Sequence, residues 1–256
     1  MSKLETYTIP PFSYLRTVKK RLQAFLQRLL GFDNYLLWFS LFKIRTLRMD
    51  RKENDFFHFL GMIEPASTVL DIGANIGIMT AHLAKMPTRR VFAIEPVPAN
   101  ARALRRIVDR FKLTNVKILE LALGDREGQV QMIMPRHSSV RMQGLSHVVQ
   151  EASDEQGEVF TVPVKRLDDM PELQKVHISA IKMDVENFEA QVLEGGRGLI
   201  SRCKPLVYCE LWDNENRSRC FAIMRSLQYQ IQVLENGKLV DFNGSQQTQN
   251  FFFKPL

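Results

Sequence analysis

The chain has 256 residues, 45% of them hydrophobic, and a formal net charge of +7. This length and apolar content predict one large α/β domain with a substantial core and exclude a disordered chain. Its three cysteines form no CxxC pair and leave an odd one, so they indicate neither a disulfide framework nor a zinc site and are typical of a protein of the reducing cytoplasm.

The N-terminal segment carries most of the basic excess. Between Phe12 and Met49, eight Lys and Arg residues stand against one acid, Asp33. Apolar residues recur there at helical spacing, namely Leu15, Val18, Leu22, Phe25, Leu26 and Leu29. We therefore predict a basic amphipathic helical extension over residues 1–52, followed by the main domain over residues 53–256. Two interpretations stay open: the apolar face caps the main domain, or residues 12–49 make a peripheral contact with an anionic membrane.

No secretory or membrane-spanning segment is predicted. The start of the chain, MSKLETYTIPPF, has no apolar core of signal-peptide length. The apolar run from Tyr35 to Phe42 is far shorter than the roughly 20 residues that cross a bilayer. We therefore expect a cytoplasmic protein whose membrane contact, if any, is limited to the surface.

The main domain alternates strand and helix patterns. Five short apolar runs are typical of strands buried on both faces: Thr68–Ile72, Arg90–Glu95, Val116–Leu121, Ile178–Val185 and Pro205–Leu211. Helical patterns separate them at Ile78–Lys85, Pro98–Phe111 and Asn187–Ile200. This alternation predicts right-handed βαβ units in a parallel, doubly wound sheet.

Antiparallel strands are expected at the C-terminal end. A helix near Arg217–Leu227 precedes a hairpin that joins Gln230–Leu234 to Leu239–Phe242 through Asn236 and Gly237. An apolar strand, Asn250–Lys254, ends the chain.

One segment is longer than a simple connection. Gly124 to Pro171 contains two alternating runs, Gln129–Met134 and Glu158–Leu167, around a polar middle. We predict an inserted β-hairpin, residues 124–171, that serves as a lid or binding loop or has no function.

The first predicted strand ends in VLDIGANIG, residues 69–77. Glycine reaches positive φ without strain and admits a ligand to the backbone, and the first glycine-rich turn of a doubly wound sheet is a cofactor site. A G-x-G-x-x-G alignment starting at Gly73 places Asn75 and Ile78 at its other two glycines, which weakens a dinucleotide reading. Glu95, at the end of the second strand, is placed to accept hydrogen bonds from a ribose diol.

Four motifs together resemble the FkbM family of S-adenosylmethionine-dependent methyltransferases. They are DIGANIG (71–77), AIEPVPAN (93–100), LALGDREG (121–128) and IKMDVENFEAQVLEGG (181–196), and the similarity extends over about residues 53–256, including the closing NFFFKP. The resemblance implies a class I Rossmann-like fold, S-adenosylmethionine as cofactor, and O-methylation of a hydroxyl on a sugar, polyketide or similar metabolite.

The resemblance also assigns residues to the cofactor. By it, Asp71, Gly73, Asn75 and Gly77 would line the methionine and ribose side, Glu95 would bind the ribose hydroxyls, and the turn at Ala122–Leu123 would border adenine. The chain departs from the family at Asn187, where relatives usually have glycine after Asp-Val-Glu. Asparagine tolerates a left-handed turn, so the backbone conformation is expected to persist.

The fourth predicted strand ends at the candidate catalytic acids. Asp184 ends it, and an extended Asp-Val-Glu directs Asp184 and Glu186 to the same side. A carboxylate that accepts the proton of an acceptor hydroxyl is worth roughly 10²–10⁴-fold in rate. We therefore name Asp184 as base or orienting acid and Glu186 as second candidate. The alternative for Glu186 and Glu189 is that acids only stabilise the start of the following helix.

Other candidates rest on weaker signals. Glu210 and Trp212 end the fifth strand, where they could bind substrate or be ordinary strand-end residues. His137 and His147 lie in the insertion and could replace Asp184 as the base. Lys182 lies within an apolar strand, where a nearby acid such as Asp184 would relieve its burial. No cluster with metal-ligand spacing appears, so no metal is predicted.

Three functions stay open from the sequence. The first is O-methylation of a small-molecule, glycan or lipid-linked hydroxylated substrate. The second is RNA methylation, against which stands a basic excess concentrated in one helix rather than interleaved with aromatic residues. The third is a non-catalytic, membrane-recruited scaffold that retains the cofactor fold.

Overall fold

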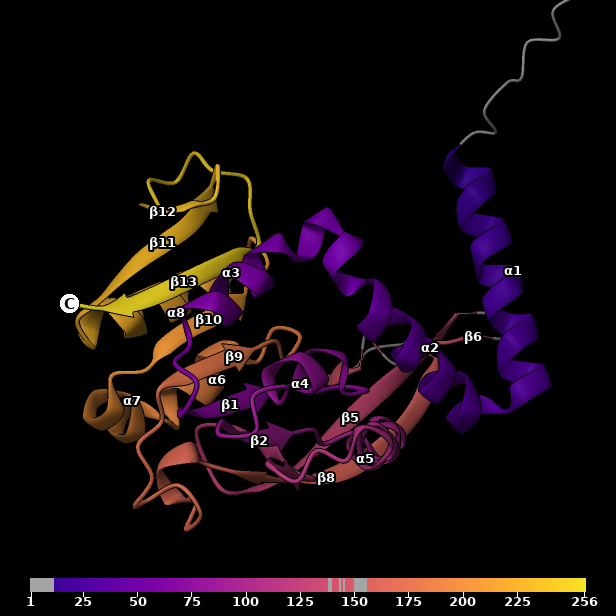
Figure 1. Cartoon of the computed structure of the whole chain (residues 1–256), viewed down its shortest axis with the longest axis horizontal. Coiled ribbons are helices and arrows are strands. Elements are labelled where there is room, and N and C mark those ends of the chain that lie inside the picture. The colour runs from indigo at the N-terminus through magenta and orange to yellow at the C-terminus, as the bar shows by residue number, and fades with distance from the viewer. Residues whose placement is uncertain (1–11, 138–139, 143, 145, 150–155) are drawn as a thin grey trace, which may run out of the picture.

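A mixed sheet of eight strands forms the centre of the protein (Figure 1), in the order β12-β11-β13-β10-β9-β1-β2-β3. The computed structural model describes residues 12–137, 140–142, 144, 146–149 and 156–256, with residues 12–20 and 137 described by their backbone alone. Five adjacent strands are parallel: β10 (Leu206–Glu210), β9 (Ala180–Met183), β1 (Thr68–Ile72), β2 (Arg90–Ile94) and β3 (Val116–Leu119). They confirm the predicted strands to within two residues at each end.

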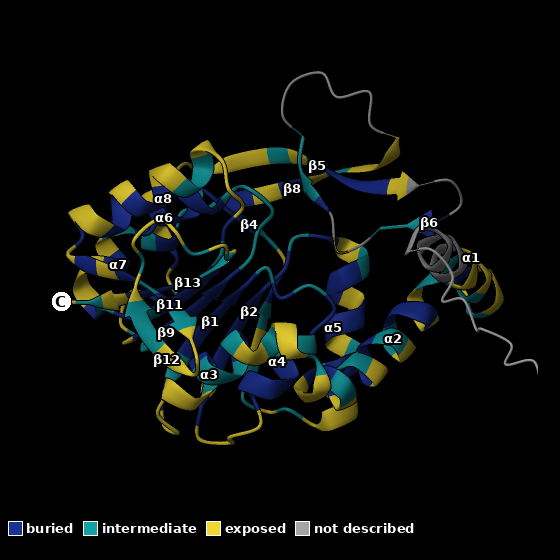
Figure 2. Cartoon of the chain, turned by 90° about the horizontal axis from the view of Figure 1, so that it is seen from above, coloured by how far each residue is buried: buried dark blue, intermediate teal, exposed yellow. Residues whose placement is uncertain are grey.

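Helices cover both faces of this sheet, as the doubly wound pattern predicts (Figure 2). Along β1, Leu70 and Ile72 join the core under three helices, α6 (Glu189–Glu194), α7 (Arg197–Cys203) and α8 (Glu215–Ser226). Val69 joins the core on the other face, under α3 (Asn54–Met62) and α4 (Ile78–Leu83). The parallel strands are buried on both faces, which is why they read as continuous apolar runs. On the Val69 face lie α3 (Asn54–Met62), α4 (Ile78–Leu83) and α5 (Pro98–Phe111).

The C-terminal strands are antiparallel, as expected. β11 (Tyr229–Glu235) and β12 (Lys238–Asp241) form the predicted hairpin, and its turn residues Asn236 and Gly237 have φ of 49° and 78°. β13 (Asn250–Pro255) lies between β10 and β11 and pairs antiparallel with both. This insertion of the last strand into the sheet was not predicted; the pattern indicated only that a strand was present.

The predicted helix Asn187–Ile200 is wrong as a single element. The chain forms two short helices, α6 (Glu189–Glu194) and α7 (Arg197–Cys203), separated at Gly195 and Gly196. A Cβ on Gly195 would lie 1.9 Å from the carbonyl oxygen of Gly124, so the start of the insertion packs directly on this break. The following helix, α8 (Glu215–Ser226), begins two residues before the prediction because the Asn214 side chain caps it by accepting a hydrogen bond from the Arg217 N–H.

The insertion forms the predicted hairpin and a small second sheet. β5 (Gly128–His137) pairs antiparallel with β8 (Gly157–Lys165) over eight residue pairs. Three short strands extend it: β4 (Ala122–Leu123) beside β8, and β6 (Val140–Arg141) and β7 (His147–Val148) beside β5.

The N-terminal segment, residues 12–52, contains two helices, α1 (Phe12–Leu30) and α2 (Phe32–Thr46), and the 3₁₀ turns η1 (Leu47–Met49) and η2 (Arg51–Glu53) follow. α2 packs against α4 and α5. The Ser40 hydroxyl donates to the carbonyl of Ile76 at 3.0 Å, and His82 Nε2 lies 3.1 Å from the carbonyl of Ile44. Thus α2 caps the main domain. No helix in the described part of the chain is long and apolar enough to cross a membrane.

Gly195→Ala tests the contact between the helix break and the insertion. The new methyl would overlap the Gly124 carbonyl, so we expect the free energy of unfolding to fall by about 3 kcal/mol or more. Gly61→Ala is the matched control, because nothing lies within 4 Å of its Cβ position and alanine favours a helix by up to about 1 kcal/mol. Equal denaturation midpoints for the two variants would contradict the packing described.

Candidate active site

The loop after β1 adopts left-handed backbone at three positions. Gly73, Asn75 and Gly77 have φ of 74°, 50° and 82°. A Cβ on Gly73 would lie 1.8 Å from the carbonyl oxygen of Asp184, and one on Gly77 would lie 2.8 Å from a methyl of Leu104. Both glycines are therefore required by close packing as well as by φ. Asparagine tolerates the conformation at position 75.

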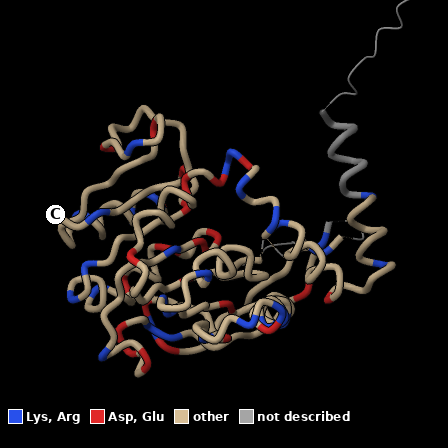
Figure 3. Tube along the Cα trace, viewed as in Figure 1, with Lys and Arg blue, Asp and Glu red and all other residues tan. Residues whose placement is uncertain are grey.

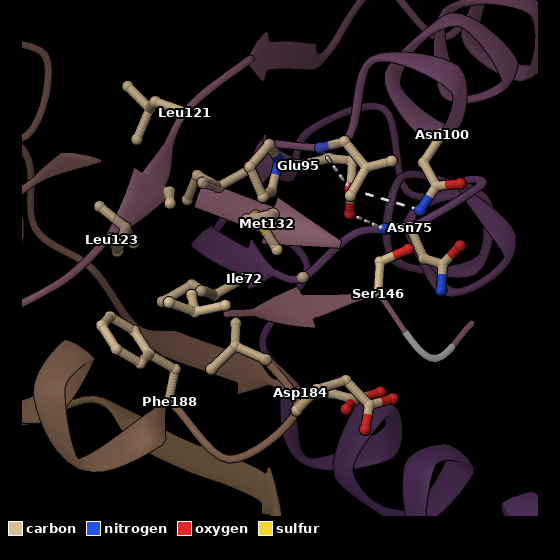
Figure 4. Close-up of a pocket in the computed structure, with 18 of the residues that line it drawn as sticks. Ile72, Asn75, Glu95, Asn100, Leu121, Leu123, Met132, Ser146, Asp184 and Phe188 are labelled. Carbon is tan, nitrogen blue, oxygen red and sulfur yellow. Dashed lines mark hydrogen bonds between the residues drawn. The ribbon is translucent and has the colours of Figure 1, made fainter. Parts of the chain in front are cut away.

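Glu95 fixes the same loop from the end of β2. One carboxylate oxygen accepts the Asn75 N–H at 2.7 Å and the other accepts the Val97 N–H at 2.9 Å (Figure 4). Glu95 is 4% exposed. Burial raises the pKa of its carboxyl to about 7, although the hydrogen bonds from Val97 and Asn75 act in the opposite direction.

A buried ammonium joins β9 to β1. Lys182 pairs in register with Asp71, and its Nζ lies 3.6 Å from Asp71 Oδ1 and 4.0 Å from Asp184 Oδ2. The ammonium also donates to the carbonyl of Gly73 at 3.0 Å, and Thr80 donates to Asp71 Oδ2 at 2.6 Å. Burial disfavours the charge of Lys182, but the surrounding acids, Asp71 foremost, outweigh it and raise its pKa.

The turn after β9 is held in an uncommon conformation. Glu186 and Asn187 have φ of 52° and 71°, and Asn187 thus keeps the left-handed backbone expected for a glycine. Glu189 is buried and accepts the Val185 N–H at 3.1 Å, so its carboxylate supports the turn. Burial, followed by the nearby carboxylates of Asp184 and Glu210, raises the pKa of Glu186 to about 8.

These residues surround a pocket at the carboxyl ends of β1, β2, β3 and β9 (Figure 4). Glu95 and Asn75 lie on one side of it, and Phe188 and Asp184 lie on the other. Among the described lining residues there are three acids, Glu95, Asp184 and Glu186, and no lysine, arginine or histidine. Apolar side chains complete the wall: Ile72, Leu121, Leu123, Val185 and Phe188.

The insertion supplies part of this wall. Met132 of β5, together with Ser146 and Val148, lines the pocket. Predicted as a lid, a binding loop or a functionless excursion, the insertion is thus in contact with the site.

A second cleft adjoins the first. It is lined by Arg51, Lys52, Glu53, Asp55, Met79, Lys182, Met183, Asp184, Tyr208, Glu210 and residues 247–250. Of the described residues, Asp184 lines both the pocket and this cleft. Burial, then the charge of Asp184, raises the pKa of Glu210 to about 7, and burial raises the pKa values of Glu53 and Asp55.

The predicted residues divide by position. The pocket brings together Gly73, Asn75, Glu95, Ala122, Leu123, Asp184 and Glu186. Asp71 and Gly77 do not line the pocket: Asp71 accepts a hydrogen bond from Thr80, and Gly77, at the end of the loop, packs on Leu104.

The substrate candidates are more scattered. Glu210 lines the second cleft, and Trp212, 44% exposed, lines neither cavity. His147 lies between two lining residues without lining the pocket itself, and the side chain of His137 lies outside the described residues.

Sequence reasoning missed several lining residues. Asn100 lies within the motif AIEPVPAN, where its position one turn into α5 was the available signal. Met132, Ser146, Glu53 and Asp55 had no signal, because only the fold brings the insertion and the N-terminal segment to this edge.

Comparison with known proteins gives a family and a fold. A family model described as the methyltransferase FkbM domain matches residues 71–235. The crystal structure of methyltransferase FkbM from Methylobacillus flagellatus superposes with a TM-score of 0.51 at 20% identity, covering 75% of this chain and 45% of that one. The chain therefore spans less than half the length of that protein, and at this identity the likeness supports the fold alone.

Two further structures show weaker similarity. An S-adenosylmethionine-dependent methyltransferase from Aquifex aeolicus has a TM-score of 0.43 at 17% identity, with 82% of this chain and 95% of that chain covered. Fibrillarin from Aeropyrum pernix, with natively bound S-adenosylmethionine, has a TM-score of 0.44 at 14% identity, with 76% and 70% covered. No protein of curated function matched the sequence.

Lys182→Met tests the buried ion pair. Removing the ammonium leaves Asp71 buried without its counter-charge, so we expect the free energy of unfolding to fall by about 3–5 kcal/mol. The double variant Asp71→Asn/Lys182→Met should recover part of this loss, because the amide carries no charge. Chemical denaturation of both single variants and the double variant measures the coupling, and strictly additive losses would show that the two side chains do not interact.

Proposed function

Because this chain belongs to the FkbM methyltransferase family, we propose that it transfers a methyl group from S-adenosylmethionine to a hydroxyl of a small polyhydroxylated acceptor, such as a sugar or glycan. The observation that carries the proposal is the pocket at the strand ends, with three acids and no basic side chain among its described lining residues. Such a lining favours a cationic ligand that also has a diol.

The pocket residues fit S-adenosylmethionine. Asn75 Oδ1 is buried and has no hydrogen-bond partner in the described part of the chain, so it offers an acceptor to a ribose hydroxyl or an ammonium. Glu95 provides carboxylate oxygens for the ribose diol. Leu121, Leu123 and Phe188 offer an apolar surface to the adenine ring, and Asp184 and Glu186 offer negative charge to the sulfonium.

The protein contributes mainly orientation to the transfer. The cofactor supplies an electrophilic methyl group on positively charged sulfur. Asp184, on the wall shared by pocket and cleft, is placed to orient the acceptor hydroxyl and to receive its proton as the new carbon–oxygen bond forms and the carbon–sulfur bond breaks. Glu186 lies on the same turn and, once ionised above its pKa of about 8, is the second group able to take that proton.

The second cleft is the proposed acceptor site. Glu53, Asp55, Asp184 and Glu210 gather in it with Arg51 and Lys52, while the ammonium of Lys182 is already paired with Asp71 and the Gly73 carbonyl. The four acids outnumber Arg51 and Lys52, so an additional anion there would be repelled by those acids that are ionised. The lining therefore favours a neutral or cationic hydroxylated acceptor over a phosphorylated one, which also argues against RNA.

The raised pKa values predict that cofactor affinity depends on pH. Glu95 and Glu186, with pKa values of about 7 and 8, are protonated below those values and must ionise to attract a cation. Affinity for S-adenosylmethionine, measured by calorimetry, should therefore rise by about tenfold from pH 6 to pH 9. S-adenosylhomocysteine, whose sulfur is uncharged, should show a smaller rise, and Glu186→Gln should reduce the difference between the two ligands. Absence of S-adenosylmethionine binding across this range would refute the proposed function.

Asp184→Asn tests the proposed base. We expect methyl transfer to fall by roughly 10²–10⁴-fold with cofactor affinity changed much less, because the amide fills the same space but takes no proton. The assay is labelling of a metabolite extract from the producing cells with methyl-labelled S-adenosylmethionine, followed by mass spectrometry of the product. Glu235→Gln, on the exposed end of β11, is the control. Undiminished transfer by Asp184→Asn would assign the base elsewhere, and label found in RNA would overturn the acceptor class.

A further inference from the structure

One side of α1 packs against the insertion, and an apolar stripe on a neighbouring side of the helix is exposed to solvent. Leu22, Phe25 and Leu29 follow one another at helical spacing and are 56%, 59% and 65% exposed. On the packed side, Gln27 is 9% exposed and exchanges two hydrogen bonds with the backbone of Arg141 in β6, at 3.2 and 3.1 Å. The helix is thus fastened to the insertion by one face while its apolar stripe faces solvent.

α2 presents a second uncovered stripe. Trp38 and Phe42, four residues apart, are each 61% exposed, and Met49 in the following turn is 81% exposed. The opposite face of α2 packs against the main domain, where Leu36 and Ser40 are completely buried. The exposed apolar residues of the two helices and the turn after them are called the apolar stripes below: Leu22, Phe25, Leu29, Trp38, Phe42 and Met49.

Basic residues recur along the N-terminal helices that carry these stripes (Figure 3). Residues 12–52 contain ten Lys and Arg residues and two acids, Asp33 and Asp50, so they account for the whole excess of the chain. Asp33 is paired with Arg102 of α5 and Asp50 with Lys43. Arg21 and Arg28 lie one residue before Leu22 and Leu29, so cations border the apolar stripe of α1.

The exposed apolar stripes and the basic residues beside them together indicate which kind of partner binds this surface. A second copy of the chain would bring an equally positive segment against the first, which opposes self-association. RNA bases could stack on the aromatic members, but Leu22, Leu29 and Met49 offer no stacking plane. An anionic bilayer matches both features, since acyl chains receive apolar side chains while headgroups neutralise the bordering cations.

We propose that residues 12–52 form a docking surface for anionic phospholipid membranes, with the apolar stripes inserted at the headgroup boundary. This inference does not depend on the proposed function. It adds one consequence if that function holds: Arg51, Lys52 and Glu53 begin two residues after Met49 and line the second cleft, so the cleft opens beside the docked surface. An acceptor hydroxyl carried by a membrane lipid would reach Asp184 from that side.

Vesicle co-sedimentation of the full chain tests the surface. Vesicles of phosphatidylcholine alone are compared with vesicles containing 30% phosphatidylserine. We expect at least tenfold stronger partitioning to the anionic vesicles, weakened by salt. The double variants Phe25→Ser/Leu29→Ser, Trp38→Ser/Phe42→Ser and Arg21→Ser/Arg28→Ser should each lower the partition coefficient by about tenfold, whereas the control Val159→Ser, 54% exposed on β8, should not.

Unchanged thermal midpoints, expected because the altered side chains are exposed, show that each variant is folded. For a variant that does unfold, the Arg21→Ser/Arg28→Ser pair and the salt dependence of the unaltered chain remain as independent readouts. Equal partitioning to both vesicle types would overturn the proposal. So would a dimer in solution that the stripe variants dissociate, or RNA binding that is lost in the same variants.

Discussion

The ammonium of Lys182 is the constraint on which the site depends. It is buried in the centre of the sheet, where an unpaired charge is not tolerated, and it is compensated by Asp71 on the adjacent strand and by the carbonyl of Gly73 in the loop. These contacts join the ends of β1 and β9. The close approach of Gly73 to the Asp184 carbonyl makes the same junction sterically exclusive. The relative position of the glycine loop and Asp184 is therefore set by the buried ammonium of Lys182 and by the lack of a side chain at Gly73.

Around this junction the protein accumulates carboxyl groups that burial keeps from ionising easily. Glu95 is held by two backbone N–H groups, and Glu186 lies on a left-handed turn that few residues adopt. Such a wall gains most from a ligand that brings positive charge, because binding then offsets the repulsion between the acids. The chemistry proposed for the pocket follows from this electrostatic imbalance more than from any single residue.

The elements outside the central sheet converge on the same edge. The insertion contributes Met132 and Ser146 to the pocket, and η2 and α3 contribute Glu53 and Asp55 to the adjoining cleft. The absence of a side chain at Gly195, in the helix break, allows the start of the insertion at Gly124 to pack directly against it. In this way one edge of the sheet joins the pocket proposed for the cofactor, the cleft proposed for the acceptor and the basic N-terminal helices.

The sequence by itself determined the alternation of strands and helices, the left-handed loop and the strand-end acids, because burial on both faces, positive φ and strand termini each leave a local signature. Thr68–Ile72 and the Asn236-Gly237 hairpin were therefore predictable. Only the tertiary structure decided that the strand Asn250–Pro255 enters the sheet between β10 and β11, and that Lys182 pairs with Asp71. Only it brought Glu53 within the same cleft as Glu210, and it left Trp38 and Phe42 exposed although they belong to a helix whose other face is core. These are contacts between residues far apart in the chain, and hydrophobic periodicity records which side chains are apolar but not which neighbour covers them.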